Sequence, residues 1–205
     1  MRRLFSYKVV YDIGFAPNPF HGGCTLATCK PKIRKLAVSG DWIVGVGAAG
    51  NRRAGQLVYA MEVGEKLTFE EYWEDARFQR KKVDRHGSLK YRYGDNVYHR
   101  DVGGAWVQVD SRHSLDDGTP NEQHLARDTG SNAVLVASRF TYWGAIGPQI
   151  PSALRDWNGI DLAEPGRDIT YRSYTTEMIE HAVAWFTSLE PGYQAEPADW
   201  AKLRR

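Results

Sequence analysis

Side chains that can exchange protons are concentrated in three short segments, residues 94–99, 111–113 and 121–128. Carboxylates and imidazoles are the groups from which general acid–base pairs are built, and carboxamides can read the edge of a base. These segments therefore supply the candidates for catalysis. The candidates are Asp95, His99, His113 and Asp128.

The last of these segments has the spacing of a helix. Asn121, His124 and Asp128 are separated by three and four residues, so a helix would place them on one face that can point into a pocket. Turn-forming residues and surface histidines explain the same composition equally well. Both interpretations stay open at the level of the sequence.

A proline-bracketed motif, Tyr-Asp-Ile-Gly-Phe-Ala-Pro-Asn-Pro-Phe at residues 11–20, follows the first expected strand. The prolines lower the cost of ordering this loop, which can then present Asp12, Phe15 and Asn18 to a planar ligand. A simple turn, in which Asp12 and Asn18 satisfy nearby backbone groups, is the alternative. Binding residues are commonly displayed at strand ends, so we predict that polar residues of this motif and of residues 94–99 converge on one cavity. The converging residues would be Asp12, Asn18, Asp95, Asn96 and His99.

Basic residues are clustered at positions 30–35 and 77–85, whereas residues 110–122 are acidic. The net charge is only +2, so the whole molecule cannot be assigned to nucleic acid on charge alone. A basic cluster can nevertheless hold phosphates, although a solvated face is its commoner meaning. The candidates for phosphate binding are Lys81, Lys82 and Arg85.

The motifs of the common cofactor enzymes are absent. The sequence has no phosphate-binding loop, no dinucleotide Gly-x-Gly-x-x-Gly, no Gly-x-Ser-x-Gly and no His-Glu-x-x-His, so we expect no cofactor. His21, Cys24 and Cys29 are spaced loosely like metal ligands, but a structural zinc site needs four ligands. We favour reduced thiols without a metal.

The elements that must position these residues follow from local patterns. Thr68 and Glu71 have capping-box spacing and predict a short helix that ends near residues 74–75. An apolar stripe from Met178 to Leu189, stopped by Pro191, predicts a longer helix that packs on a sheet. Residues 77–92 and 110–132 are expected to be irregular. Further expected elements are a helix from residue 31 and strands at 4–11, 42–47, 56–63, 97–99, 106–109 and 133–137.

The overall profile is that of an ordinary globular protein. The chain has 205 residues, of which 42% are hydrophobic and 25% charged. No linker divides it, so we expect a single domain over residues 1–205. Strands grouped with short helices, without regular βαβ alternation, predict an α+β fold with a curved mixed sheet or a barrel and peripheral helices. The chain lacks a secretory leader and any membrane-length apolar run, and its only two cysteines are expected to be reduced, which together predict a cytoplasmic location.

Six segments, taken in order, resemble the second type of nucleotide-modification-associated domain family. They are Tyr-Asp-Ile-Gly-Phe-Ala-Pro-Asn-Pro-Phe, Cys-Thr-Leu-Ala-Thr-Cys-Lys-Pro, Gly-Asp-Trp-Ile-Val-Gly, Val-Tyr-Ala-Met-Glu-Val, Glu-Tyr-Trp-Glu-Asp-Ala-Arg-Phe and Gly-Asp-Asn-Val-Tyr-His. The resemblance implies a role with systems that make, read or remove modified bases in bacterial and phage DNA. The order of strands and helices is also similar to PUA-like barrels, which bind flipped or modified bases.

One hypothesis from this resemblance is an enzyme that acts on a modified base in DNA, such as a glycosylase-like hydrolase. It would cut the N-glycosidic bond or alter a base substituent, and it would extrude the nucleotide because base chemistry cannot proceed inside the stack. Asp95 or Asp128 would act as acid, base or oxocarbenium stabiliser, with His99 or His113 as proton partner. The base-binding candidates are Asp12, Phe15, Asn18, Trp42, Asn96 and Tyr98.

Two other hypotheses use the same residues. A non-catalytic reader would discriminate a modified base in the pocket while the basic clusters hold phosphates. An enzyme of the free nucleotide pool would leave those clusters without a role. In each case the partner is DNA or a nucleotide with a modified base, and no membrane is involved.

Overall fold

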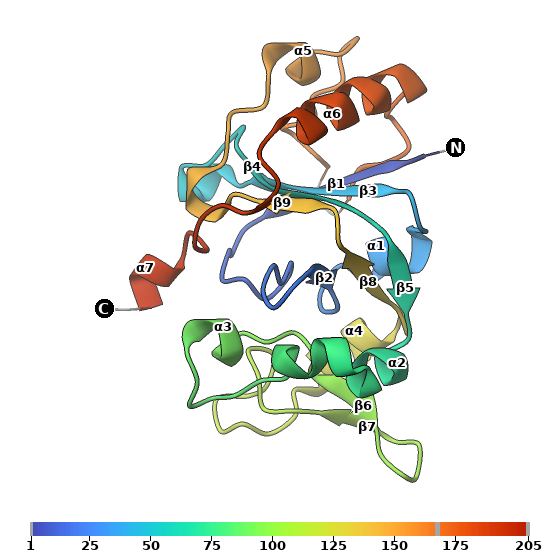
Figure 1. Ribbon diagram of the computed structural model, residues 1–205, viewed down its shortest axis with the longest axis vertical. Coiled ribbons are helices and arrows are strands. Elements are labelled where there is room, and N and C mark those ends of the chain that lie inside the picture. Colours follow the sequence, from blue (N-terminus) through green and yellow to red (C-terminus); the bar gives the residue numbers. More distant parts are fainter. Residues whose placement is uncertain (1, 167–168, 204–205) are drawn as a thin grey trace. The chain divides into compact units, whose positions relative to one another are not determined.

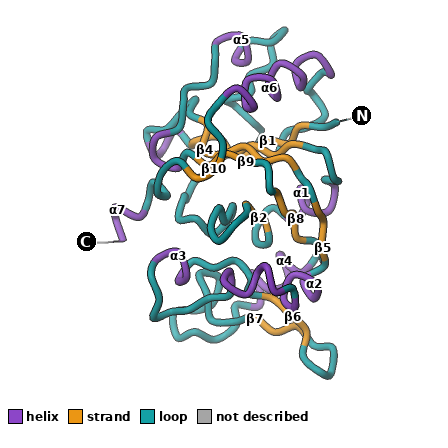
Figure 2. Tube along the Cα trace, in the orientation of Figure 1, coloured by secondary structure: helices purple, strands orange, loops and turns teal. Residues whose placement is uncertain are grey.

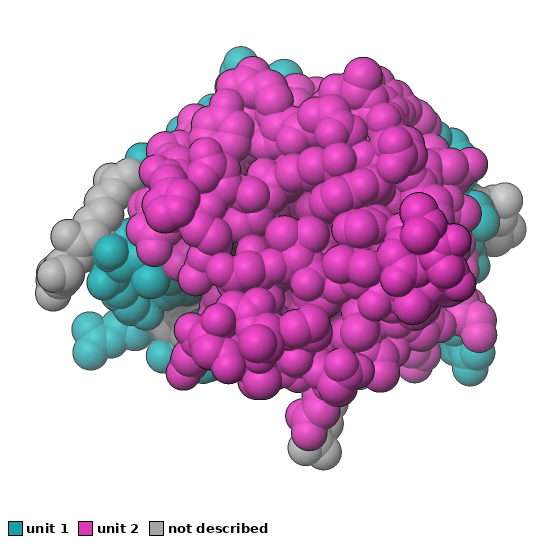
Figure 3. Space-filling view, turned by 90° about the horizontal axis from the view of Figure 1, so that it is seen from below, with its two compact units in different colours: residues 1–12, 37–64, 137–205 teal, residues 13–36, 65–136 magenta. Residues whose placement is uncertain are grey.

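The computed structural model of the chain describes residues 2–166 and 169–203. The chain is divided into two compact units, each assembled from separate stretches of sequence. Unit 1 comprises residues 1–12, 37–64 and 137–205, and unit 2 comprises residues 13–36 and 65–136 (Figure 3). The single domain predicted for residues 1–205 stays a prediction.

A five-stranded mixed sheet forms the centre of unit 1 (Figure 1). In spatial order its strands are β1 (Leu4–Val9), β3 (Trp42–Gly47), β4 (Leu57–Glu62), β9 (Phe140–Tyr142) and β10 (Gly192–Tyr193). β1 pairs with β3 and β10 with β9 in parallel, while β4 runs antiparallel to both of its neighbours. The predicted α+β class with a mixed sheet is confirmed. The predicted barrel alternative is wrong for the described residues, because β1 and β10 are the separate edges of an open sheet.

The longest helix of unit 1 is α6 (Thr176–Ser188), which lies over the sheet in Figure 1. It begins where the Thr175 side chain accepts a hydrogen bond from the Met178 amide. The buried stripe of α6, which runs from Met178 to Phe186, packs in one core with Leu4 and other sheet residues. The predicted C-terminal helix is therefore confirmed. None of the helices in the described part of the chain is long and apolar enough to cross a membrane.

Shorter elements complete unit 1. They are the 3-10 turns η1 (Ala49–Asn51) and η3 (Gly144–Ile146) and the helices α5 (Ser152–Arg155) and α7 (Trp200–Leu203).

Unit 2 is built from short elements joined by loops, which Figure 2 shows in teal. Its three-stranded sheet has the order β2, β8, β5, and β6 forms an antiparallel hairpin with β7. The strands are β2 (Cys24–Leu26), β5 (Glu65–Leu67), β6 (Tyr98–Arg100), β7 (Trp106–Gln108) and β8 (Val134–Ala137), the last residue of which belongs to unit 1. The helices are α1 (Pro31–Leu36), α2 (Phe69–Glu74), α3 (Leu89–Arg92), α4 (Glu122–Thr129) and the 3-10 helix η2 (Ala76–Lys81).

The capping box predicted for α2 is present. Thr68 Oγ1 accepts a hydrogen bond from the Glu71 amide at 3.1 Å, and the Glu71 carboxylate accepts one from the Thr68 amide at 2.7 Å. The buried face of α2 then carries Phe69 and Tyr72 into the core of unit 2, where they pack with Phe15, Tyr98 and other apolar residues.

Two segments that were expected to be irregular contain helices. Residues 77–92 hold most of η2 and all of α3, and residues 110–132 hold α4. The one fully buried side chain of α4 is Asp128, so the apolar periodicity that reveals most helices is missing there. A polar residue, rather than an apolar stripe, fastens this helix to its unit.

Candidate functional site

The loop before α1 holds Cys29 in a left-handed backbone conformation. Its φ is 58°, a region that residues other than glycine rarely adopt. Two contacts fix it there, because the Cys29 amide donates to Asp128 Oδ1 at 3.2 Å and its carbonyl accepts from Arg34 Nε at 2.9 Å. Such strain persists when the surroundings determine the conformation, and it is commonest at functional sites.

The Cys29 thiol contacts a histidine, which in turn contacts an aspartate. Cys29 Sγ lies 3.6 Å from His113 Nε2, and His113 Nδ1 lies 2.9 Å from Asp128 Oδ2. An ionised carboxylate can only accept, so Nδ1 carries a proton and Nε2 faces the thiol. Cys29 is partly exposed, whereas His113 is 7% exposed and Asp128 is fully buried. Thiol, imidazole and carboxylate thus stand in the order that is able to activate a thiol.

Asp128 accepts hydrogen bonds from four residues of this cluster. Besides the bonds from Cys29 and His113, it accepts one from Tyr98 Oη at 3.0 Å and one from Arg127 Nε at 3.0 Å. Burial opposes its charge, but the bonds and charges of His113 and Arg127 outweigh burial and hold its pKa well below the usual range. Asp128 is therefore ionised at neutral pH.

The same balance acts on the imidazole of His113. Burial disfavours its charged form, yet the hydrogen bonds to Asp128 and Cys29, together with their charges, raise the pKa of His113 above 6.5. The ring is enclosed by Phe15, 4.7 Å away edge-on, and by the His124 ring at 4.4 Å. These contacts leave His113 few alternative orientations.

His124 presents a neutral ring beside this cluster. Its Nδ1 lies 3.1 Å from the His113 carbonyl, which can only accept, so Nδ1 is protonated and Nε2 keeps a lone pair. Burial and the charges of His113 and Arg127 lower the pKa of His124. Since His124 and Arg127 are less buried than Asp128, they join Cys29 as the accessible members of the cluster.

Lys81, a predicted phosphate contact, lies inside unit 2. Its Nζ donates to the Asn18 carbonyl at 3.0 Å, to Asn18 Oδ1 at 2.7 Å and to the Gly23 carbonyl at 3.0 Å. Its side chain is fully buried and burial lowers its pKa. Three backbone and side-chain oxygens hold the Lys81 ammonium in the interior, where it has no direct access to a phosphate in this conformation.

Asp95 is buried next to this lysine. Thr25 Oγ1 donates to its carboxylate at 2.6 Å and Tyr72 Oη at 2.7 Å. Burial raises the pKa of Asp95, although the charge of Lys81 opposes the shift. Because Asp95 is 0% exposed, it has no direct access to a substrate in this conformation.

The predicted convergence on one cavity is only partly reproduced in unit 2. Asn96 is buried near the same network, with its Nδ2 bonded to the Tyr72 carbonyl at 3.0 Å. His99 instead stacks on Trp73 at the surface, with ring centroids 4.0 Å apart. Asn18, Asp95 and Asn96 thus belong to buried hydrogen-bond networks in unit 2, and His99 is not part of them.

Asp12, the fifth residue of that prediction, belongs to unit 1. Its carboxylate accepts hydrogen bonds from Tyr142 Oη and from the Ala198 amide, and it lies 3.3 Å from Arg53 Nη1. The Asp12 amide in turn donates to Asp199 Oδ2 at 2.8 Å. Asp12 therefore ties the C-terminal segment to β1.

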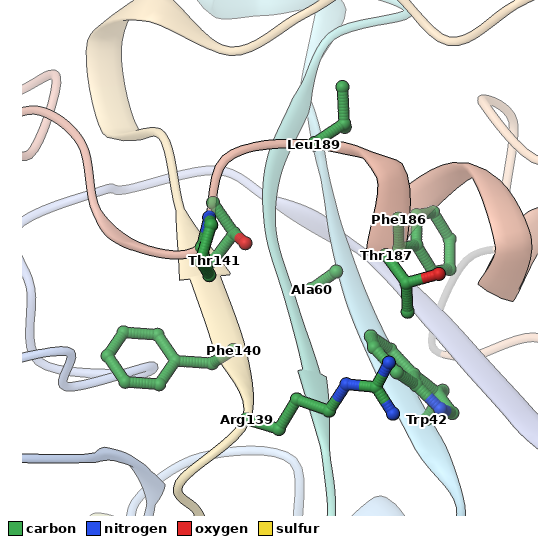
Figure 4. Close-up of a pocket in the computed structure, with 9 residues that line it drawn as sticks. Trp42, Ala60, Arg139, Phe140, Thr141, Phe186, Thr187 and Leu189 are labelled. Atoms are coloured by element: carbon green, nitrogen blue, oxygen red, sulfur yellow. The ribbon is translucent and has the colours of Figure 1, made fainter.

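Trp42, a predicted base-binding residue, lines a pocket of about 200 Å³ in unit 1 (Figure 4). The pocket lies where α6 ends above β3, β4 and β9, and Figure 4 shows the Arg139 guanidinium beside the indole. Arg139 lies 5.7 Å from the centre of the indole ring and also pairs with Glu62 at 3.1 Å. Aromatic walls with one cation suit a planar ring that carries an anionic group.

The remaining candidates are divided between core and surface. Phe15 and Tyr98 were predicted to stack on a base, but their rings are 3% and 0% exposed and pack in the core of unit 2. Lys82 lies at the surface with its Nζ 3.7 Å above the Trp73 ring, and Arg85 lies 3.4 Å from Asp110. Phosphate binding by these two side chains stays a prediction.

Metal ligation by His21, Cys24 and Cys29 finds no support in the described residues, in which no three His, Cys, Asp or Glu side chains are grouped to hold an ion. Cys24 is fully buried, and burial raises the pKa of its thiol to about 12.

Sequence reasoning did not place Cys29 beside His113 and Asp128, although it named the latter two as candidates. The three residues are 84 and 99 positions apart along the chain, so their proximity has no local pattern. The available signal was the Cys-Lys-Pro turn before a predicted helix in a chain that also holds histidine and aspartate candidates.

Comparison with known proteins gives one family. Curated proteins and solved structures yield no match. The family model described as nucleotide modification associated domain 2 matches residues 1–204, which is essentially the whole chain. Its description associates the domain with nucleotide modification and names no reaction. The chain therefore belongs to the nucleotide modification associated domain 2 family.

Proposed function

We propose that the protein recognises and processes a modified base in DNA, with His113 and Asp128 as its acid–base centre. The observation that carries the proposal is the 2.9 Å bond that fixes the His113 tautomer and turns Nε2 toward the exposed side of the cluster. General acid–base catalysis needs such an oriented ring with a pKa near the working pH. The family's association with nucleotide modification supplies the substrate theme.

The base would reach this centre from the side of Cys29, His124 and Arg127. A base in a duplex must leave the stack before its substituents are accessible, so the nucleotide would be flipped. The Arg127 side chain is 43% exposed, and no hydrogen bond joins its terminal nitrogens to another described residue. Arg127 can then contact a flanking phosphate while Asp128 holds its Nε.

The test is to incubate the protein with DNA that carries assorted modified bases and to identify released products by mass spectrometry. Product formation should be lost in His113→Gln and retained in His86→Gln, since His86 is an exposed histidine of the same unit. Equal turnover by both variants would remove His113 from the mechanism.

A non-catalytic reader is the alternative, and the pocket of unit 1 favours it. That pocket offers Trp42, Phe186 and Arg139 but no acid–base pair among the residues that line it. A reader would bind modified DNA without turnover, and Arg139→Ala would weaken binding while His113→Gln would not. A protein that binds only free modified nucleotides would instead act on the nucleotide pool.

A further inference from the structure

We propose that Cys29 is the nucleophile of this site and that the protein removes acyl groups from a base nitrogen through a thioester. The substrate part of this inference rests on the proposed function, because it takes the base to be the carrier of the acyl group. The thiol part rests on the cluster itself and can be tested without any substrate.

The two cysteines differ in the features that decide reactivity. Cys29 is partly exposed and its Sγ lies 3.6 Å from a base that is already oriented, whereas Cys24 is completely buried. The thiolate is the nucleophilic form of cysteine, and an adjacent histidine that can take the proton activates it. Cys24 therefore provides an inert reference thiol within the same chain.

The groups around Cys29 are held rigidly. Both backbone polar groups of Cys29 are bonded, to Asp128 and to Arg34. The His113 carbonyl accepts from Gln108 Nε2 at 3.3 Å as well as from His124, so the base is anchored at both ends. Preorganisation of nucleophile and base contributes much of the rate in such sites.

The carboxylates of unit 2 argue against chemistry at the sugar. Cleavage of a glycosidic bond needs a carboxylate that can approach the developing oxocarbenium ion. Asp128 and Asp95 are both 0% exposed, and each already accepts hydrogen bonds at both oxygens. The accessible nucleophile is the thiol, and thiolates react readily with acyl carbons. We therefore place the reaction at a base substituent and not at the glycosidic bond.

The reaction balances with water as its only co-reactant. His113 takes the thiol proton, and Cys29 Sγ forms a bond to the carbonyl carbon of the acylated nitrogen. The carbon–nitrogen bond breaks as the leaving nitrogen receives that proton from His113, which leaves a thioester and the unacylated base. Water, deprotonated by His113, then attacks the thioester, and its products are a carboxylic acid and the regenerated thiol.

The first experiment measures alkylation of the protein by iodoacetamide, with the labelled peptides identified by mass spectrometry. We expect Cys29 to be labelled and Cys24 to remain unlabelled. At about pH 6, His113→Gln should slow labelling of Cys29 by about tenfold or more, because the imidazolium charge that stabilises the thiolate is lost. His86→Gln should not change the rate. Equal rates in the protein and in His113→Gln, or equal labelling of both cysteines, would overturn the assignment of Cys29.

The second experiment uses an oligonucleotide that contains N4-acetylcytosine as the probe. Deacetylation should be abolished in Cys29→Ala, and the peptide that contains Cys29 should carry a hydroxylamine-sensitive acetyl group during turnover. A urea unfolding midpoint of Cys29→Ala equal to that of the parental protein would show that the variant is folded.

The outcomes separate the two proposals. Deacetylation that persists in Cys29→Ala would overturn the nucleophile while keeping a base-processing function. If alkylation of Cys29 depends on His113 but the probe stays acetylated, the acyl substrate is overturned and the assignment of Cys29 as nucleophile is kept.

Discussion

Two fully buried acids of unit 2 have pKa values shifted in opposite directions. The pKa of Asp95 is raised by burial, while that of Asp128 is held well below its usual range. Asp95 accepts hydrogen bonds from the neutral hydroxyls of Thr25 and Tyr72, and the charge of Lys81 does not outweigh its burial. Asp128 instead accepts hydrogen bonds directly from His113 and Arg127. At neutral pH, only Asp128 has the paired charge that can stabilise an imidazolium.

This pairing predicts a pH dependence of stability. The pKa of His113 is above 6.5 in the folded protein, so the folded state binds the proton more tightly than the unfolded state. The resulting stabilisation is complete below pH 6.5 and is lost as the pH rises through the folded-state pKa. The difference in free energy of unfolding between the protein and His113→Gln should therefore shrink as the pH rises. Urea unfolding over a pH series measures it, and a difference that stays constant from about pH 6 to 9 would contradict the prediction.

Replacement of Lys81 should lower the free energy of unfolding and leave nucleic-acid binding unchanged. Lys81→Met removes one hydrogen-bond donor from each of three buried oxygens of Asn18 and Gly23 and should cost about 3 kcal/mol in urea unfolding. Lys82→Met removes a contact with Trp73 and an attraction to Glu74 at the surface, and it should cost less than about 1 kcal/mol. Equal losses in the two variants would refute this assignment.

The helices and strands with apolar or capping patterns were predicted from the sequence. The stripe of α6, the capping box of α2 and the apolar run of β3 are local features, and each was predicted close to its observed bounds. The sequence left a helix and a turn both open at residues 121–128, because the buried contact of α4 is made by an aspartate and not by an apolar stripe. The parallel pairing of β1 with β3 has no local signature either, since residues 13–36 of unit 2 intervene in the sequence.

The candidate site shows the same limit. Its imidazole and carboxylate were named because they lie in clusters of titratable and amide side chains, but the thiol lies between Thr28 and Lys30, beside the basic cluster at 30–35. Burial also cannot be read from residue type, so Asp95, Lys81 and Tyr98 were expected at a ligand and are found in the interior. Tertiary packing, not composition, decides which polar groups stay accessible.

Asn121 should control the start of α4, which carries both His124 and Asp128. Its side chain accepts hydrogen bonds from the Gln123 and His124 amides at 3.1 and 3.2 Å. Asn121→Ala should cost about 1 kcal/mol in urea unfolding and speed hydrogen exchange in the first turn, while Asn121→Ser should retain the cap. Unchanged exchange in Asn121→Ala would argue against the cap.

Across the whole molecule, charge is balanced locally rather than gathered in one strong patch. The net charge is +2, and several surface arginines are paired with carboxylates, as Arg77 is with Glu65 and Arg100 with Glu70. Each such pair reduces the positive charge that is available to DNA phosphates. DNA binding should accordingly be weak unless a modified base is present.

The remaining basic candidates predict how that binding responds to salt. Replacing Lys82 and Arg85 together by alanine should weaken DNA binding and make the log–log salt dependence shallower by about 1 to 2 units. Lys202→Ala, at an exposed site in unit 1, is the matched control. Affinity and slope that both remain parental would identify residues 82 and 85 as a solvated face.

The two units should unfold together. The chain passes between them at residues 12–13, 36–37, 64–65 and 136–137, so neither unit is a continuous segment that can be separated. We expect far-ultraviolet circular dichroism and tryptophan fluorescence to report one coincident urea transition. Two resolved transitions would contradict the single domain predicted from the sequence.

The division of unit 1 along the sequence has a consequence for synthesis on the ribosome. Unit 2 is complete at residue 136, whereas β9, β10 and α6 are translated later. Until α6 emerges, the nascent β1, β3 and β4 carry Leu4, Val44 and Ala60 without the helix residues that share their core. An incomplete chain that displays such apolar surface is a substrate for chaperones. We therefore expect cotranslational folding to begin with unit 2, and β1, the first strand to be made, to be among the last to be covered.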